Sequence, residues 1–181
     1  MNNGSRPKAV REGYSPPRFF FRQAYGPDAE RWVAWTGQVE ELKTLSYRLL
    51  ECFTEEVEVL FKMEREDGVQ SEEDPWQRYH GACSREELTS AIRTHEELVF
   101  QDGGNQLCIR CAEEGDYLAL DEHGILFLYT EGDGFAAICR ELGFEERTQP
   151  LLCEGGHWHV RPPHAMERAQ SFVDELGLEA V

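Results

Sequence analysis

The sequence predicts an α+β fold: a single domain with a mixed, largely antiparallel sheet of about six to seven strands and about four helices. Two observations support this expectation. Segments with apolar residues at helical spacing are interspersed with segments in which apolar and polar residues alternate. Turn residues also join strand-like segments directly, which favours hairpins and therefore antiparallel pairing.

Four segments have the features of helices. The clearest follows Thr36, the expected N-cap, because its apolar residues recur at steps of three and four positions. A capping box at 84–87 begins the second predicted helix, which extends to Val99. The third covers 134–142 and ends before a glycine. The fourth begins after Pro162-Pro163 and ends at Gly177.

The predicted strands are short and separated by turn signals. An aromatic segment at 18–25 ends at Gly26-Pro27, and residues 57–64 alternate between apolar and polar side chains. The other predicted strands cover 107–111, 116–120, 125–129, 151–153 and 157–160. Residues 66–79 are predicted to form an acidic surface loop, in which Trp76 and Tyr79 fold back onto the body.

The chain is expected to divide into an extended N-terminal arm, residues 1–17, and one domain, residues 18–181. The arm is the one cationic stretch and lacks apolar periodicity. The start of the chain lacks the apolar core of a secretion signal, so we expect a cytoplasmic protein with reduced cysteines. No apolar run is long enough to predict a membrane span.

Acidic residues dominate the charge balance: 35 Asp and Glu against 18 Lys and Arg give a net charge of −17. This charge disfavours binding to a nucleic-acid backbone, which requires cations opposite the phosphates, and favours a basic protein partner. The predicted partner-binding residues lie around the acidic loop; they are Glu64, Glu66, Asp67, Glu72, Glu73, Asp74 and Trp76.

Sequence motifs for catalysis or cofactor binding are missing: there is no phosphate-binding loop, dinucleotide fingerprint or nucleophile elbow. We therefore predict no catalytic residues and no cofactor.

Thiols and imidazoles are the usual zinc ligands, and the weak metal candidates are Cys108, Cys111, Cys153, His157 and His159. Cys108 and Cys111 count against this set, because an i, i+3 pair in a strand points to opposite faces. Cys83, between His80 and a predicted helix N-terminus, is a weak candidate nucleophile.

Three functions remain open at this stage. The first is a non-catalytic, acidic interaction module, such as an adaptor, inhibitor or immunity-type protein, that engages a basic protein. The second is a subunit of a homo- or hetero-oligomer, with the N-terminal arm lying on a neighbour. The third is a small metal-dependent protein that uses the Cys/His group. The charge and the missing motifs favour the first.

Overall fold

A nine-stranded, mostly antiparallel sheet forms the centre of the computed structural model, which describes residues 8–10, 18–27, 29–65, 75–112, 115–148 and 158–181. The strand order is β11-β5-β4-β6-β7-β8-β3-β2-β9, and within it β2 and β9 are parallel. A separate two-stranded sheet pairs β1 with β10. The strands are β1 (Ala9–Val10), β2 (Phe19–Gly26), β3 (Ala29–Trp35), β4 (Glu56–Glu64), β5 (Trp76–Ser84), β6 (Asn105–Cys111), β7 (Tyr117–Leu120), β8 (Leu126–Tyr129), β9 (Glu145–Glu146), β10 (Trp158–His159) and β11 (Glu179–Ala180).

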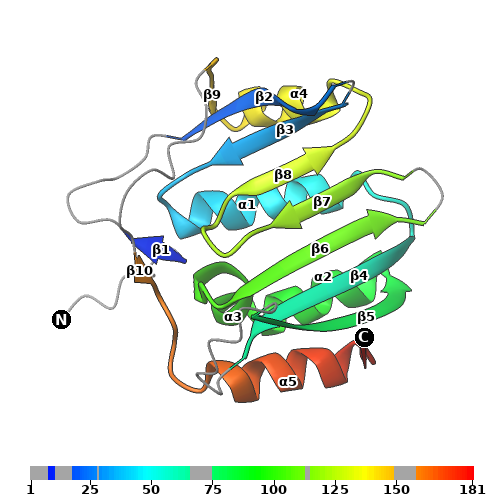
Figure 1. The fold of residues 1–181 in the computed structure, drawn as a ribbon. Coiled ribbons are helices and arrows are strands. Elements are labelled where there is room, and N and C mark those ends of the chain that lie inside the picture. The colour runs from blue at the N-terminus through cyan, green and yellow to red at the C-terminus, as the bar shows by residue number, and fades with distance from the viewer. Residues whose placement is uncertain (1–7, 11–17, 28, 66–74, 113–114, 149–157) are drawn as a thin grey trace.

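Helices within the described residues pack against one face of the large sheet (Figure 1). They are α1 (Val39–Leu50), α2 (Arg85–Thr94), α3 (Glu96–Gln101), α4 (Gly134–Glu141) and α5 (Ala165–Glu175). None of these five has the length and apolar character of a membrane span. All five contribute side chains to the main hydrophobic core.

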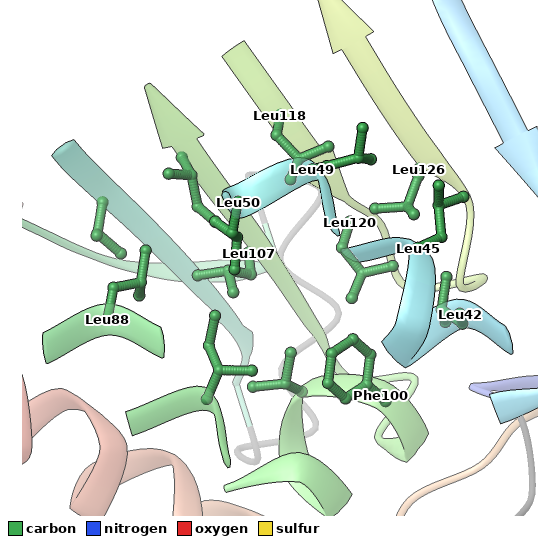
Figure 2. Packing of buried hydrophobic residues seen from close by; sticks show 14 of the residues in the cluster. Leu42, Leu45, Leu49, Leu50, Leu88, Phe100, Leu107, Leu118, Leu120 and Leu126 are labelled. Carbon is green, nitrogen blue, oxygen red and sulfur yellow. The ribbon is translucent and has the colours of Figure 1, made fainter. Parts of the chain in front are cut away.

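The core lies between the helices and the sheet. Strand β4 defines the sheet side, because Val57, Val59 and Phe61 are fully buried while the residues between them are only partly covered. Figure 2 shows the leucines of α1 opposite leucines of β6, β7 and β8. Burying a side chain of this size contributes roughly 1.5–3 kcal/mol, so this interface is the main source of stability. A second apolar cluster, Phe19, Phe21, Val33 and Ile125, involves β2 and β3 residues that alternate with members of the main core.

The structure confirms the α+β class and the largely antiparallel sheet. The predicted stripe of α1 is buried, and the capping box of α2 is formed. The predicted hairpin is β7–β8, with Gly124 at a φ of +76° in its turn. Gly143 and Gly177 follow α4 and α5 with positive φ, as expected for helix ends.

The numbers of elements differ from the prediction. Five helices are present because the segment from 84 to 99 divides at His95, where φ is −113° and ψ is 30°. The sheet has nine strands because it includes β3 and β5, which were not predicted as strands, and the two-residue edge strands β9 and β11. The prediction of a loop at 66–79 is wrong for its last residues, because β5 begins at Trp76 and pairs with β4 along its whole length. β5 is a strand because it pairs with β4, and not because its own sequence alternates between apolar and polar residues.

Residues 9–10 and 158–159, which are distant in the sequence, pair in the small β1–β10 sheet. Ala9 pairs with His159, so this part of the predicted arm is an extended strand on the same chain. The strands predicted at 151–153 and 157–160 lie mostly outside the described residues, and Trp158 and His159 pair with β1. The division into arm and domain at residue 17 stays a prediction.

Removing the N-cap of α2 should destabilise the protein measurably. The Ser84 side chain accepts a hydrogen bond from the Glu87 amide, and the Glu87 side chain accepts one from the Ser84 amide. We expect Ser84→Ala to lower the free energy of unfolding by about 1 kcal/mol, because an amide donor loses its partner. Urea unfolding measures this change. Ser90→Ala, at an exposed position within the same helix, is the control, and an equal loss there would contradict the assignment to capping.

Candidate functional site

An acidic hollow lies where β4 begins and where β5 and β6 end. It is a cavity of about 940 Å³. A neighbouring cavity of about 270 Å³ shares Ala82, Cys83 and Glu87 as wall residues. We call the two together the acidic groove; its lining consists of Thr54, Glu55, Glu56, Val57, Glu58, Ala82, Cys83, Ser84, Glu87, Ser90, Ala112, Glu175 and Leu176.

Among the described residues, the lining of the acidic groove carries glutamates and no lysine, arginine or histidine. Glu55 and Glu56 are exposed and make no ion pair within the described part of the chain. Glu58 pairs with Arg110 at 3.6 Å, and Glu175 pairs with His95 at 3.0 Å. Hydrogen bonds from Ser84 lower the pKa of Glu87, which therefore stays ionised. The groove is a region of excess negative charge with room for a cationic side chain.

Hydrogen bonds from Arg85 fix the backbone that carries Glu55 and Glu56. Arg85, the first residue of α2, donates hydrogen bonds from its guanidinium group to the carbonyl oxygens of Glu51 and Phe53, both at 2.9 Å. Its amide donates to the carbonyl oxygen of Glu55 at 2.7 Å. These bonds fix the connection between α1 and β4 against the start of α2. Glu55 and Glu56 therefore project from a braced turn at the end of a strand.

The thiol of Cys83 lines the groove but is not an activated nucleophile. Burial, together with the carboxylate of Glu87, raises its pKa to about 11, although it lies just before a helix N-terminus. The structure also separates the proposed pair. Cys83 is opposite Val57 in the ladder and His80 is opposite Leu60, so the two side chains point to opposite faces of β5. The hypothesis of a Cys83–His80 pair is wrong.

Two of the residues predicted to bind a partner, Glu64 and Trp76, are described, and they lie at the other end of the β4–β5 pair. Glu64 and Trp76 are directly opposite each other in the ladder, and Arg161 reaches Glu64 at 3.4 Å. Glu66, Asp67, Glu72, Glu73 and Asp74 fall outside the described residues. Their role therefore stays a prediction. The acidic groove was missed because its walls come from three strand ends that are distant in sequence.

The structure does not bring Cys108 and Cys111 together. In β6, Cys108 is opposite Leu60, whereas Cys111 is opposite Val57 and belongs to the main core, so the two thiols lie on different faces of the sheet. Burial raises the pKa of Cys108. Cys153 and His157 lie outside the described residues. His159 Nδ1 donates a hydrogen bond to the Gly103 carbonyl oxygen at 2.7 Å.

A buried lysine forms a second polar site that sequence reasoning missed. We call it the lysine socket and define it by Lys8, Asp102, Asn105, Asp121 and Glu122. Burial lowers the pKa of Lys8 to about 8, and the charges of the three carboxylates oppose this shift. The ammonium form therefore predominates at neutral pH. The sequence could not predict this burial, because a single lysine in a polar segment has no pattern that distinguishes it from an exposed lysine.

Asp121, Glu122 and His123, in the β7–β8 turn, each offer a ligand atom, and these atoms lie within 4.8 Å of one another. Asp121 caps the turn by accepting hydrogen bonds from the amides of His123 and Ile125. Its hydrogen bond to the imidazole raises the pKa of His123. The Lys8 ammonium interacts with the carboxylates of Asp121 and Glu122. Lys8 therefore already supplies a positive charge to this turn.

A third cavity, of about 520 Å³, lies where β3 and β8 diverge beyond Trp32 and Leu128. Two arginines line it, in contrast to the acidic groove. The guanidinium carbon of Arg31 lies 4.0 Å from the Phe127 ring centroid, and its Nη1 donates to the Tyr129 hydroxyl at 2.7 Å. This cavity carries both positive and negative side chains, so it is less suited than the acidic groove to a basic partner. It therefore serves as a comparison for the groove.

Cys83 should react slowly with alkylating reagents. Its raised pKa leaves little thiolate at neutral pH, and the thiolate is the reactive form. We expect iodoacetamide to modify exposed Cys52 at least about tenfold faster than Cys83. Peptide mapping by mass spectrometry at timed intervals measures both rates in the same sample. Preferential labelling of Cys83 would contradict this description of the groove.

The lowered pKa of Lys8 predicts how stability depends on pH. Lys8 titrates near 8 in the folded protein and near 10.5 when unfolded, so the unfolded chain binds more protons between these values. Stability must therefore rise with pH across this window. We expect the free energy of unfolding, relative to Lys8→Met, to rise by up to a few kcal/mol from pH about 8 to pH about 10.5. Urea unfolding at a series of pH values measures the difference, and a constant or falling difference would contradict it.

Comparison of the chain with protein-family models, curated protein sequences and solved structures finds no match. Neither a shared family nor a similar fold therefore indicates an activity. The evidence for function is the charge and geometry of the groove and socket themselves.

Proposed function

We propose that this protein is a non-catalytic, acidic interaction module that binds a basic protein, in the manner of an adaptor, inhibitor or immunity-type protein. The observation that supports this proposal best is the acidic groove, which includes a cavity of about 940 Å³ whose described lining residues include four glutamates and no cationic side chain. A lysine or arginine side chain of a partner complements such a hollow in both charge and size. We propose the cytoplasm as the place where this binding occurs.

The charge of the whole chain supports the same proposal. A net charge of −17 attracts a basic partner over a distance of roughly 8–10 Å, the Debye length near physiological ionic strength. Such a field speeds encounter, whereas contacts in the groove give specificity. Because hydrogen bonds from Arg85 already hold the backbone that carries Glu55 and Glu56, little backbone conformational entropy is lost when a partner binds there.

The two alternative functions have less support. A metal-dependent function through Cys108 and Cys111 is disfavoured, because these thiols lie on different faces of β6. A role as a subunit of a larger assembly remains a second proposal. Its motivation is the basic N-terminal arm, although residues 9–10 pair with β10 of the same chain.

Charge reversal in the groove should abolish partner binding selectively. We expect immobilised wild-type protein to retain one or more basic proteins from a cell extract at low ionic strength and to release them at high salt. The double variant Glu55→Lys/Glu56→Lys should retain them at least about tenfold less, because repulsion replaces attraction at the groove. Quantitative mass spectrometry of the retained proteins measures the loss.

The matched control is Glu131→Lys/Glu167→Lys, which changes the net charge equally at two exposed positions outside the acidic groove. This control should keep the partner. If both double variants lose the same proteins, binding follows net charge and the groove is not the site. Retention that is indifferent to ionic strength would contradict an electrostatic interface altogether.

A further inference from the structure

Lys8 is bound in the way that a protein binds a ligand. Its side chain is 0% exposed, and Nζ donates hydrogen bonds to the backbone oxygen of Asn105 at 3.0 Å and to its Oδ1 at 2.8 Å. The Asn105 side chain is oriented for this role, because its Nδ2 donates to the carbonyl oxygens of Leu98 and Asp102. Two acceptors thus converge on a single nitrogen.

Carboxylates complete the lysine socket. In order of effect, Asp121, Asp102 and Glu122 stabilise the positive charge on Lys8. Asp102 is itself only 1% exposed. Its Oδ1 accepts from the Gly104 amide at 2.9 Å and lies 3.4 Å from Arg161 Nε, whereas its Oδ2 is buried without a hydrogen-bond partner in the described structure. A buried charge of this kind requires a nearby cation.

The backbone around the lysine socket is shaped to hold the arm closely. The Lys8 carbonyl oxygen accepts from the Val160 amide at 2.8 Å, and the Val160 carbonyl oxygen accepts from the Gly103 amide at 2.7 Å. A Cβ atom on Gly103 would lie 2.4 Å from the Lys8 carbonyl oxygen. The glycine is therefore required for the three segments to lie this close together.

We propose that the lysine socket is a binding site for a primary alkylamine, and that residues 8–10 form a strap whose Lys8 is the chain's own ligand for that site. The site includes the bound amine, converging acceptors, compensating carboxylates and a closely fitted backbone. This inference is independent of the acidic groove, which lies at the ends of β4, β5 and β6.

The chemistry of the lysine socket specifies a primary amine. Two N–H groups of the ammonium are used by Asn105, and the third remains available to face the surrounding carboxylates. The channel for the unbranched stem is fully buried, so a bulkier head group would not fit. A trimethylated amine keeps the charge but has no N–H donor, and an alcohol has one donor but no charge.

Chemical rescue tests the site directly. In the full chain, Lys8→Ala should open the strap and raise amide exchange at Val160 and Gly103, whose amides donate to the Lys8 and Val160 carbonyl oxygens, by about tenfold or more. Millimolar n-butylammonium should restore protection, because it replaces the missing stem and head group. n-Butanol and butyltrimethylammonium, which each lack part of the required chemistry, should not.

Lys43→Ala is the matched control, since Lys43 of α1 pairs with Glu40 at 3.0 Å and with Glu96 at 2.7 Å, neither of which belongs to the lysine socket. It should leave the strap closed and give no response to the amine. Gly103→Ala is a second route to opening, because it disturbs the backbone without altering the amine. If Lys8→Ala does not fold, recovery of cooperative melting with n-butylammonium supports the site. Wild-type exchange in Lys8→Ala, no rescue by the amine, or equal rescue by n-butanol would overturn the proposal.

Discussion

The pairing of β4 with both of its neighbours is the constraint on which the structure depends. β4 pairs with β5 along its whole length and with β6 along most of it, while Val57, Val59 and Phe61 bury one face of β4 beneath the helices. A shift of one residue would move these side chains to the other face. The register therefore fixes where the three strands end, and the acidic groove forms at those ends.

Elements that carry their own signal could be predicted from the sequence. The stripe of α1, the capping box at Ser84 and the β7–β8 turn at Gly124 each arise from local physics, and each is present. β5 could not be predicted in this way, because its Trp76 to Ser84 segment contains a glycine and little alternation. Its strand conformation comes from hydrogen bonds to β4, which are interactions between distant parts of the chain.

The candidate sites could not be predicted from the sequence for a similar reason. Acidic residues occur throughout this sequence, so no pair of neighbouring glutamates distinguishes itself; only the fold shows that Glu55 and Glu58 share a hollow with Glu87. The lysine socket is less accessible still to sequence reasoning. Its members come from the N-terminal arm, the turn before β6 and the β7–β8 turn, and a cation in a polar segment ordinarily indicates a solvated surface.

The acidic groove and the lysine socket both depend on negative charge, but they should respond differently to ionic strength. Glutamates in the open groove are hydrated and screened by salt, so each contributes little alone and together they act on an approaching partner. The carboxylate of Asp102 is buried, where screening is weak and an uncompensated charge is costly. High ionic strength should therefore weaken partner binding while leaving Lys8 in its socket, so recognition and strap closure are independent consequences of one acidic composition.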